Sequence, residues 1–324
     1  MKKGQLFGSL ILVFVAMIWG TSFAVQRAGM EHIQPVTFTA ARMTLAAVAV
    51  GIVALLQKDD SSSPGERISL RRTNLLGGLF CGLFLASGSI FQQIGIVNTS
   101  AGKAGFITAL YILLVPVFSF ILFRRKYPWL VWVAVLIGIA GMYLMCMNES
   151  FTLAGSDILI IICAFMFTGH ILCCDYFVKR GNAIRISAVQ MAVTAAISWI
   201  FAFIMETPSI DQIRSAAIPI LYCGLVSGGI GFTLQLVAQK YSDPTVASLL
   251  MSLESVFAAI GGAVILHERM SARELIGCII MFSAIIIVQI PVKGKKRSPF
   301  CREGLQVTFI HDGRRRKTHG CSDT

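Results

Sequence analysis

Long apolar runs separated by short polar segments make up most of the chain, and each run is long enough for one membrane-spanning helix. A helix needs about 20 consecutive apolar residues to cross the hydrocarbon core of a bilayer. The sequence therefore predicts ten spans, near residues 6–26, 36–56, 74–97, 101–123, 128–147, 154–176, 184–204, 216–238, 244–266 and 272–292. The connections are short and leave no room for a soluble domain, and the polar residues 57–72 are predicted to be a flexible linker.

The composition supports an all-α integral membrane protein. Of 324 residues, 56% are hydrophobic and 14% charged, and the mean hydropathy is +0.75, whereas about 25% of a soluble domain is charged. The basic start of the chain leads into an apolar run longer than a typical signal core, so we expect a retained first helix.

The net charge of +12 reflects orientation in the membrane rather than a nucleic-acid partner. Before the tail, thirteen Lys and Arg residues lie on the side of the amino terminus. The opposite side carries five: Arg27, Lys103, Arg214, Arg269 and Arg273. Because basic residues collect on the cytoplasmic side, we expect both termini to be cytoplasmic.

An internal duplication divides the spans into two sets of five. A shift of 147 residues aligns Gly77 with Gly224 and Gln92 with Gln239, and later the shift becomes 144. Five is an odd number, so the second copy must enter the membrane from the opposite side, which makes an inverted repeat. We predict a first repeat at 1–148, a second at 149–292 and a basic disordered tail at 293–324, which would at most contact anionic lipid.

Glycine and proline gather in corresponding helices of the two halves. The third span carries Gly77, Gly78, Gly82 and Gly88, and the eighth carries Pro219, Gly224, Gly228, Gly229 and Gly231. Interrupted helices at matching positions indicate a transport site. Small residues also permit close helix packing, and the sequence leaves both interpretations open.

The most informative polar residue is Glu254, which stands near the middle of an apolar run. An ionisable side chain at that depth is costly and indicates a functional role. The alternative is a neutral carboxyl that hydrogen bonds to a neighbouring helix. Our hypothesis is that Glu254 exchanges a proton when a site alternates between two aqueous phases.

Other polar residues inside the spans are candidates for a substrate pathway: Trp19, Ser22, Gln26, Gln92, Lys103, Tyr111, His170 and Gln235. Each has a structural alternative, such as interfacial anchoring for Trp19 or snorkelling for Lys103. Arg42 cannot lose its charge at ordinary pH, so we expect a structural ion pair with a group such as Glu31.

Enzymatic and cofactor-dependent functions find no support in the residue patterns. His170, Cys173 and Cys174 resemble a soft metal site, but no second cluster completes it, so we predict no metal and no cofactor. Seven of nine cysteines lie in or beside apolar spans, where thiols behave as small hydrophobes, and we expect no structural disulfide. Glycine-rich segments inside spans lack the context of a phosphate loop.

Four stretches together resemble the EamA-type branch of the drug/metabolite transporter (DMT) superfamily. They are WGTSF at 19–23, Arg42 in the second span, TSAGKAGFITALY with LVP at 99–116, and LESVFAAIGGAVILHERM at 253–270. The resemblance covers about residues 6–292, and Trp19, Lys103, Tyr111 and Glu254 fall on its motifs. The family often has proline after the ninth-span glutamate, where this chain has Ser255.

The resemblance implies two inverted five-helix repeats in the inner membrane of a prokaryote and a central cavity for a small-molecule substrate. We therefore expect a secondary transporter that exports or exchanges amino-acid-like or amphipathic metabolites by alternating access, with proton coupling as a hypothesis. The alternatives are an uncoupled facilitator or exchanger and a non-transporting membrane scaffold subunit. Membrane lipid is an expected partner, and the sequence leaves a homodimer open.

Overall fold

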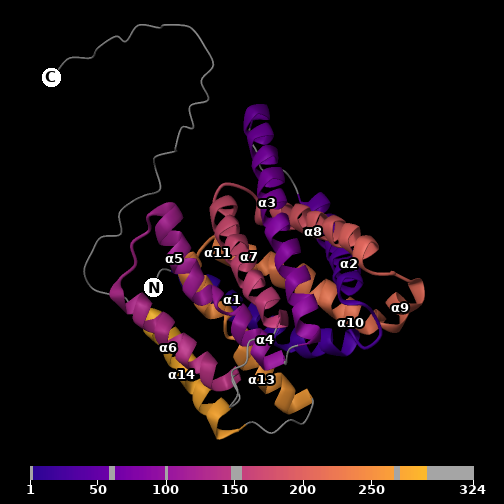
Figure 1. Ribbon diagram of the computed structural model, residues 1–324. Helices are drawn as coiled ribbons and strands as arrows, with labels where there is room; N and C mark the ends of the chain where they lie inside the picture. Colours follow the sequence, from indigo (N-terminus) through magenta and orange to yellow (C-terminus); the bar gives the residue numbers. More distant parts are fainter. Residues whose placement is uncertain (1–2, 58–62, 99–100, 147–154, 266–270, 290–324) are drawn as a thin grey trace, which may run out of the picture. The chain divides into compact units, whose positions relative to one another are not determined.

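The computed structural model describes residues 3–57, 63–98, 101–146, 155–265 and 271–289, and every regular element in them is a helix (Figure 1). In chain order the helices are α1 Lys3–Gly29, α2 Pro35–Leu56, α3 Pro64–Val97, α4 Ala101–Thr108, α5 Tyr111–Phe123, α6 Trp129–Cys146, α7 Gly155–Val178, α8 Ala183–Met205, α9 Ile210–Ser215, α10 Ala217–Leu221, the π-helix η1 Tyr222–Phe232, α11 Thr233–Gln239, α12 Pro244–Met251, α13 Glu254–Ile265 and α14 Ala272–Gln289.

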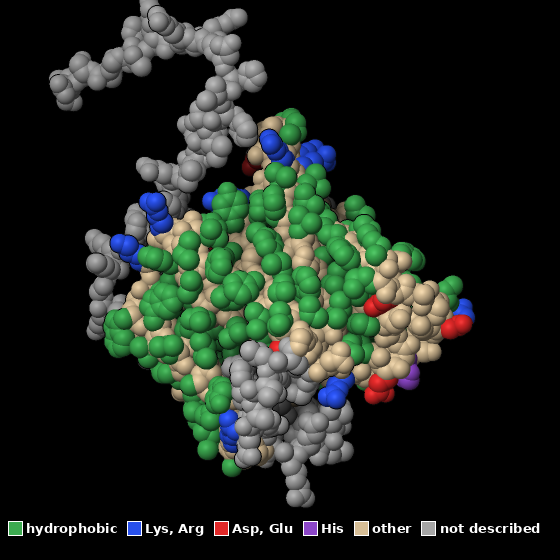
Figure 2. Space-filling model, in the orientation of Figure 1, with side chains coloured by type: hydrophobic (Ala, Val, Ile, Leu, Met, Phe, Trp, Pro, Cys, Tyr) green, Lys and Arg blue, Asp and Glu red, His purple; other side chains and the backbone are tan. Residues whose placement is uncertain are grey.

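Six helices of the described residues are long and apolar enough to cross a membrane: α1, α2, α3, α7, α8 and the continuous run 217–239 formed by α10, η1 and α11. Shorter apolar helices occupy 111–123, 129–144, 244–258 and 275–288. Large apolar side chains remain exposed on the outside, including Leu55, Ile218 and Ile204, and Figure 2 shows such side chains over much of the visible face. An all-helical, multi-pass membrane protein accounts for this surface.

Two of the predicted spans are broken, which the hydrophobic pattern did not predict. The predicted span 101–123 consists of α4 and α5, interrupted at Ala109 and Leu110, and the predicted span 244–266 consists of α12 and α13, interrupted at Ser252 and Leu253. At the second break a side chain satisfies one backbone carbonyl, because the Ser252 hydroxyl donates to the carbonyl of Leu249 at 2.7 Å. The 144-residue shift that aligns the halves carries Ala109 onto Leu253, so the breaks correspond.

The predicted linker 57–72 is wrong in its second part, because α3 already begins at Pro64. Ser63 accepts a hydrogen bond from the backbone N–H of Glu66, and proline stands at the first helical position. Serine followed three residues later by glutamate is a helix-start signal, and proline is favoured just inside such a start. Residues 58–62 lie outside the described part.

Helices of the two halves pack in reciprocal pairs. The helix α3 packs against α7 and α8, and in the same manner the run 217–239 packs against α1 and α2. The last spans of the two halves, α6 and α14, lie against each other at one edge (Figure 1). The largest buried apolar cluster joins α1, α4–α7 and α12–α14. This pairing is the one that a duplicated chain produces.

The glycines of α3 serve close packing rather than a kink. A Cβ at Gly78 would lie 2.3 Å from the Cβ of Val189 in α8, and one at Gly77 would lie 2.9 Å from the Phe177 side chain of α7. In the eighth span the glycines lie within the π-helix η1 and also permit close packing, since a Cβ at Gly224 would lie 2.8 Å from the carbonyl oxygen of Arg42 in α2. Of the two interpretations that the sequence left open, packing holds for α3.

Replacing Gly78 with alanine should destabilise the protein, because Val189 and the carbonyl of Ile186 leave no room for a methyl group. We expect a loss of roughly 1–3 kcal/mol, as for overpacked cores. Gly51→Ala is the matched control, since nothing lies within 4 Å of its Cβ position, and alanine there should be neutral or stabilising. Thermal unfolding in detergent checks both, and equal melting temperatures would contradict the packing role.

Candidate functional site

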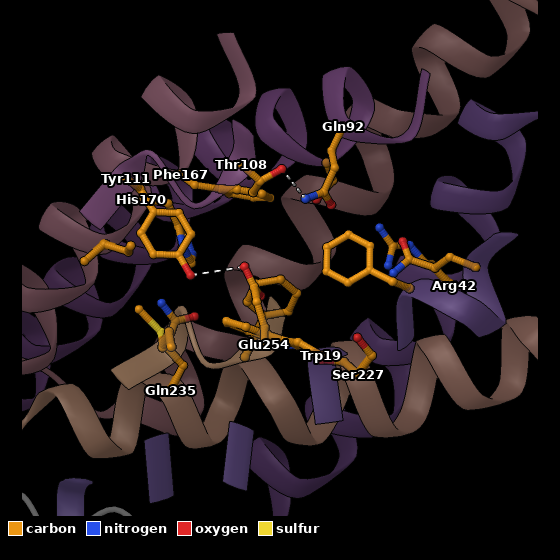
Figure 3. Close-up of a pocket in the computed structure, with 16 residues that line it drawn as sticks. Trp19, Arg42, Gln92, Thr108, Tyr111, Phe167, His170, Ser227, Gln235 and Glu254 are labelled. Carbon is orange, nitrogen blue, oxygen red and sulfur yellow. Dashed lines mark hydrogen bonds between the residues drawn. The ribbon is translucent and has the colours of Figure 1, made fainter. Parts of the chain in front are cut away.

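A cavity lies where the two broken helices meet α1, α2, α3, α7 and the run 217–239 (Figure 3). The space open to the centres of water-sized probes is about 60 Å³, enough for a few water molecules. The residues that line it are Trp19, Phe23, Gln26, Arg42, Ser89, Gln92, Thr108, Tyr111, Phe167, His170, Ile171, Ser227, Phe232, Gln235, Met251 and Glu254. Both halves of the chain therefore contribute to one site.

Seven of the nine residues proposed from sequence for a substrate pathway line this cavity: Trp19, Gln26, Gln92, Tyr111, His170, Gln235 and Glu254. Ser22 does not, because its buried hydroxyl donates to the carbonyl of Ile18 in its own helix at 2.6 Å. The side chain of Lys103 lies outside the described part of the structure.

The centre of the cavity is a hydrogen bond between the two helix breaks. Tyr111 is the first residue of α5 and Glu254 the first residue of α13. The Tyr111 hydroxyl donates to Oε1 of Glu254 at 3.1 Å, and both side chains are buried. The N-terminus of a helix also favours negative charge. The Tyr111 hydroxyl thus supplies the buried Glu254 side chain with a hydrogen-bond donor.

The close contacts of Gly20 explain why the WGTSF stretch contains a glycine. A Cβ on Gly20 would lie 2.5 Å from the carbonyl oxygen of Glu254 and 2.6 Å from the Cβ of Phe257. Glycine therefore lets α1 approach the start of α13 at backbone distance. The neighbouring residue, Trp19, consequently reaches the cavity beside Glu254.

Trp19 connects α1 to the π-helix. Its indole Nε1 donates to the carbonyl of Ser227 at 3.2 Å, and its ring packs on Phe232 with centroids 4.8 Å apart. A Cβ at Gly231 would lie 2.7 Å from the same nitrogen. π-Helical turns occur frequently at functional sites, and η1 presents both a carbonyl and an aromatic ring to this cavity.

His170 is held from α8 at the other side of the cavity. Its Nε2 lies 3.1 Å from Oε1 of Gln190 and 3.4 Å from Sγ of Cys174, and its ring makes an edge contact with Phe232. Among the described residues no group of three His, Cys, Asp or Glu side chains is arranged to hold a metal ion. The hydrogen bond with Gln190 fixes the orientation of the imidazole, which forms part of the cavity wall.

The structural ion pair expected for Arg42 is not formed. Glu31 is exposed, and no acidic side chain of the described residues lies within 4 Å of the Arg42 guanidinium. The side chain is only 4% exposed and faces the cavity instead. The sequence pattern identified the charge but assigned it the wrong surroundings.

The sequence analysis also missed Ser89, Thr108, Phe167, Ser227 and Phe232. Thr108 accepts from Nε2 of Gln92 at 3.3 Å, and it stands one helical turn before Tyr111. Because Thr108 lies on the same helix face as Tyr111, its position in the sequence could have indicated that it lines the cavity. Phe167 and Phe232 are ordinary apolar residues of apolar spans, so no sequence signal separates them from the core.

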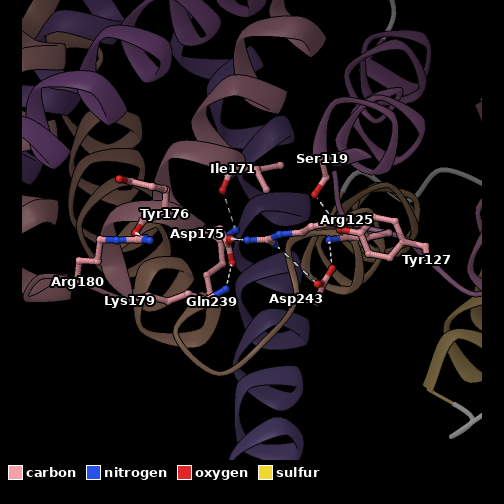
Figure 4. Close-up of polar contacts among 11 residues, drawn as sticks. Ser119, Arg125, Tyr127, Ile171, Asp175, Tyr176, Lys179, Arg180, Gln239 and Asp243 are labelled. Atoms are coloured by element: carbon pink, nitrogen blue, oxygen red, sulfur yellow. Dashed lines mark hydrogen bonds and ion pairs between the residues drawn. The ribbon is translucent and has the colours of Figure 1, made fainter. Parts of the chain in front are cut away.

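A second polar cluster joins the halves near the ends of α5 and α7 and the start of α12 (Figure 4). Arg125 Nη2 lies 2.6 Å from Oδ2 of Asp175, and Lys179 pairs with Oδ1 of the same carboxylate. Arg125 Nη1 also lies 3.8 Å from Asp243, which accepts from the backbone N–H of Thr245 and caps α12. Burial raises the pKa of Asp243, and the Thr245 hydrogen bond and Arg125 oppose that rise.

Comparison with known proteins shows a family. The model of the EamA-like transporter family matches residues 6–147 and 155–290. An uncharacterized transporter of Archaeoglobus fulgidus is 25% identical over 288 residues, which cover 89% of this chain and 87% of that protein. The uncharacterized transporter YoaV of Bacillus subtilis is 20% identical, over 85% of this chain and 94% of its own length. A protein crystal structure shares the fold with a TM-score of 0.70, 21% identity and coverage of 87% of this chain and 96% of that one.

Replacing Asp175 with asparagine should destabilise the protein, because Arg125 and Lys179 both lose their carboxylate partner. The Asp175 side chain is 2% exposed, but its partners are about a third exposed. The loss should therefore be roughly 2 kcal/mol, below the 3–5 kcal/mol of a fully buried pair. Asp211→Asn, at an exposed position in α9, should change little. Thermal unfolding compares the two variants, and equal stability would contradict a structural role for the cluster.

Proposed function

Because the chain belongs to the EamA-like transporter family, we propose that it is a secondary transporter that exports or exchanges small metabolites, amino-acid-like or amphipathic, by alternating access. The observation that supports this most directly is the cavity between the two helix breaks, lined by Tyr111 of α5 and Glu254 of α13. Broken helices that meet near the middle of a bundle are a recurring form of transport site.

We further propose that residues 1–148 and 149–292 are two inverted five-helix repeats that rock against each other. The corresponding order of the helices and the corresponding interruptions support this division, although helices such as α2 and α8 or α3 and α7 pack across it. With both termini cytoplasmic, as the basic residues predict, the protein would lie in the inner membrane of a prokaryotic cell. The basic segment 293–324 lies outside the described residues and has no part in this mechanism.

The polar cluster of Arg125, Asp175, Lys179 and Asp243 would then lie at the cytoplasmic end of the cavity. Arg125 belongs to the first half, and both carboxylates belong to the second. Rocking of the halves apart at this side must separate Arg125 from Asp175. The cluster would therefore close the cytoplasmic side, and opening would break it.

Glu254 is the candidate for proton coupling. A charged Glu254 accepts from Tyr111, and a proton taken up from the outer phase would neutralise it before the site turns inward. Release of that proton to the cytoplasm restores the carboxylate, so that one proton enters as solute leaves. The same hydrogen bond from Tyr111 could instead keep Glu254 charged throughout the cycle. Glu254 would then exchange no proton, and the protein would be an uncoupled exchanger.

Glu254→Gln should abolish uptake or export driven by a proton gradient, because an amide cannot exchange the proton. Counterflow exchange of labelled amino acids should remain, since the amide keeps the shape and the hydrogen bond with Tyr111. Proteoliposomes with and without a pH gradient measure both rates, and a drop of at least about ten-fold in the gradient-driven rate is expected.

Glu31→Gln is the matched control, because Glu31 is exposed outside the cavity. Its gradient-driven rate should equal that of the unmodified protein. Equal gradient-driven transport by Glu254→Gln would remove the coupling role and leave the uncoupled exchanger. Absence of both gradient-driven transport and counterflow for every solute offered would favour the scaffold subunit.

Arg125→Gln should open the cytoplasmic side more often. Cys174 is fully buried next to Asp175, and Cys223 is fully buried where the run 217–239 packs on α2. A thiol reagent applied from the cytoplasmic side should label Cys174 several-fold faster in the variant, while Cys223 labels at the unchanged rate. Mass spectrometry locates the label. Faster labelling of both thiols would indicate general unfolding, and unchanged labelling of Cys174 would argue against a closing role.

A further inference from the structure

We propose that Arg42 binds a carboxylate of the transported solute, so that the cavity selects small carboxylates that also carry hydrogen-bond donors. The inference rests on the proposed transport function and names the group that recognises the substrate. It follows from the surroundings of Arg42, from the unpaired amides of the cavity and from their arrangement around Glu254.

The Arg42 guanidinium is buried without a counter-charge. It is 4% exposed, its Nε has no hydrogen-bond partner, and no acidic side chain of the described residues lies within 4 Å. The ring of Phe38 lies against the guanidinium, with its centroid 5.8 Å from Cζ. A single aromatic face compensates only part of a buried charge.

Such a charge is costly to keep inside a membrane protein. Arginine cannot shed its proton, and an unpaired buried charge costs several kcal/mol. An anion that enters the cavity would offset this cost. The planar guanidinium matches a carboxylate in a two-bond geometry, which makes a carboxylate the chemical group that this position favours.

Two further residues of the cavity lining carry buried amide oxygens without a protein partner. Oε1 of Gln26 and Oε1 of Gln235 are buried and without a protein partner, and both residues line the cavity. Glu254 lies between Gln235 and Arg42, and Tyr111 and His170 lie on the side away from Arg42 (Figure 3). A solute that places its carboxylate on Arg42 would bring an ammonium or hydroxyl donor toward the carboxyl oxygens of Glu254.

The competing explanation is that Arg42 only supports the packing of α2 and is hydrated. In that case its removal would change stability but would not change which solutes bind. A selectivity measurement therefore separates the two explanations better than a transport rate does.

The test uses the purified full chain and thermal stabilisation by matched solutes: α-amino acids, their primary amides, and the corresponding aminophosphonic acids. We expect the acids to bind at least about ten-fold more tightly than the amides, as charge-assisted bonds to a buried cation require. In Arg42→Gln the acids should weaken about ten-fold and the amides should not change. Arg42→Lys should restore part of the preference, and Arg214→Gln, at an exposed position, should retain all of it.

Several outcomes would overturn the proposal. They are equal stabilisation by acids and amides, an unchanged preference for acids in Arg42→Gln, and stabilisation by none of the acids.

Preference for the phosphonic acids, lost in Arg42→Gln, would keep the anion site but replace the carboxylate by a phosphate-like group. Size-exclusion profiles identify a misfolded variant, in which case Arg42→Lys carries the comparison. Transport of neutral or cationic solutes alone would refute the carboxylate site and leave the transporter intact.

Discussion

The absence of water inside a bilayer is the constraint on which the rest of this structure depends. Every backbone group and charge within the hydrocarbon must find a partner in the protein or in an enclosed cavity. Two helices are interrupted by short turns, at Ala109–Leu110 and at Ser252–Leu253, and the backbone N–H groups of these four residues still donate to carbonyls of the preceding turn. Tyr111 and Glu254 follow these turns directly, and their side chains meet in the cavity through one hydrogen bond.

Close packing of α1 then determines what the cavity contains. Gly20 brings α1 against the backbone of Glu254, and Trp19 therefore reaches both the start of α13 and the carbonyl of Ser227 in η1. A bulkier residue at position 20 would separate the helices and with them the indole from its acceptor. One short stretch thus couples the break in the second half to the π-helix, which explains why glycine and tryptophan stand side by side there.

The sequence predicted much of this fold because apolar runs of membrane length indicate helices directly. It also identified seven of the sixteen cavity residues, since a polar side chain such as Glu254 or Gln235 in an apolar helix needs an interior partner. The breaks were missed because apolar residues surround them and a two-residue interruption leaves the hydrophobic pattern intact. The surroundings of Arg42 were missed for a different reason: the pattern shows a charge but not its distance to Glu31, and proximity in sequence suggested a pair that the described residues do not form. The early start of α3 was readable from Ser63 and Glu66.

The two halves correspond in backbone but not in chemistry. The 147-residue shift carries Arg42 onto Val189, which packs against α3, and the 144-residue shift carries Glu254 onto Leu110. Each half therefore supplies one charge to the shared cavity, the cation from the first and the carboxylate from the second. In the proposed mechanism the two halves move relative to each other, and these opposite charges would then make the cavity sensitive to what occupies it. A solute that contacts both Arg42 and Glu254 would connect the two halves. A proton on Glu254 would weaken that contact and leave the contact with Arg42 unchanged. In that mechanism the duplication would provide the symmetry for the movement, and the divergence of two positions would provide a cavity whose charge a proton can change.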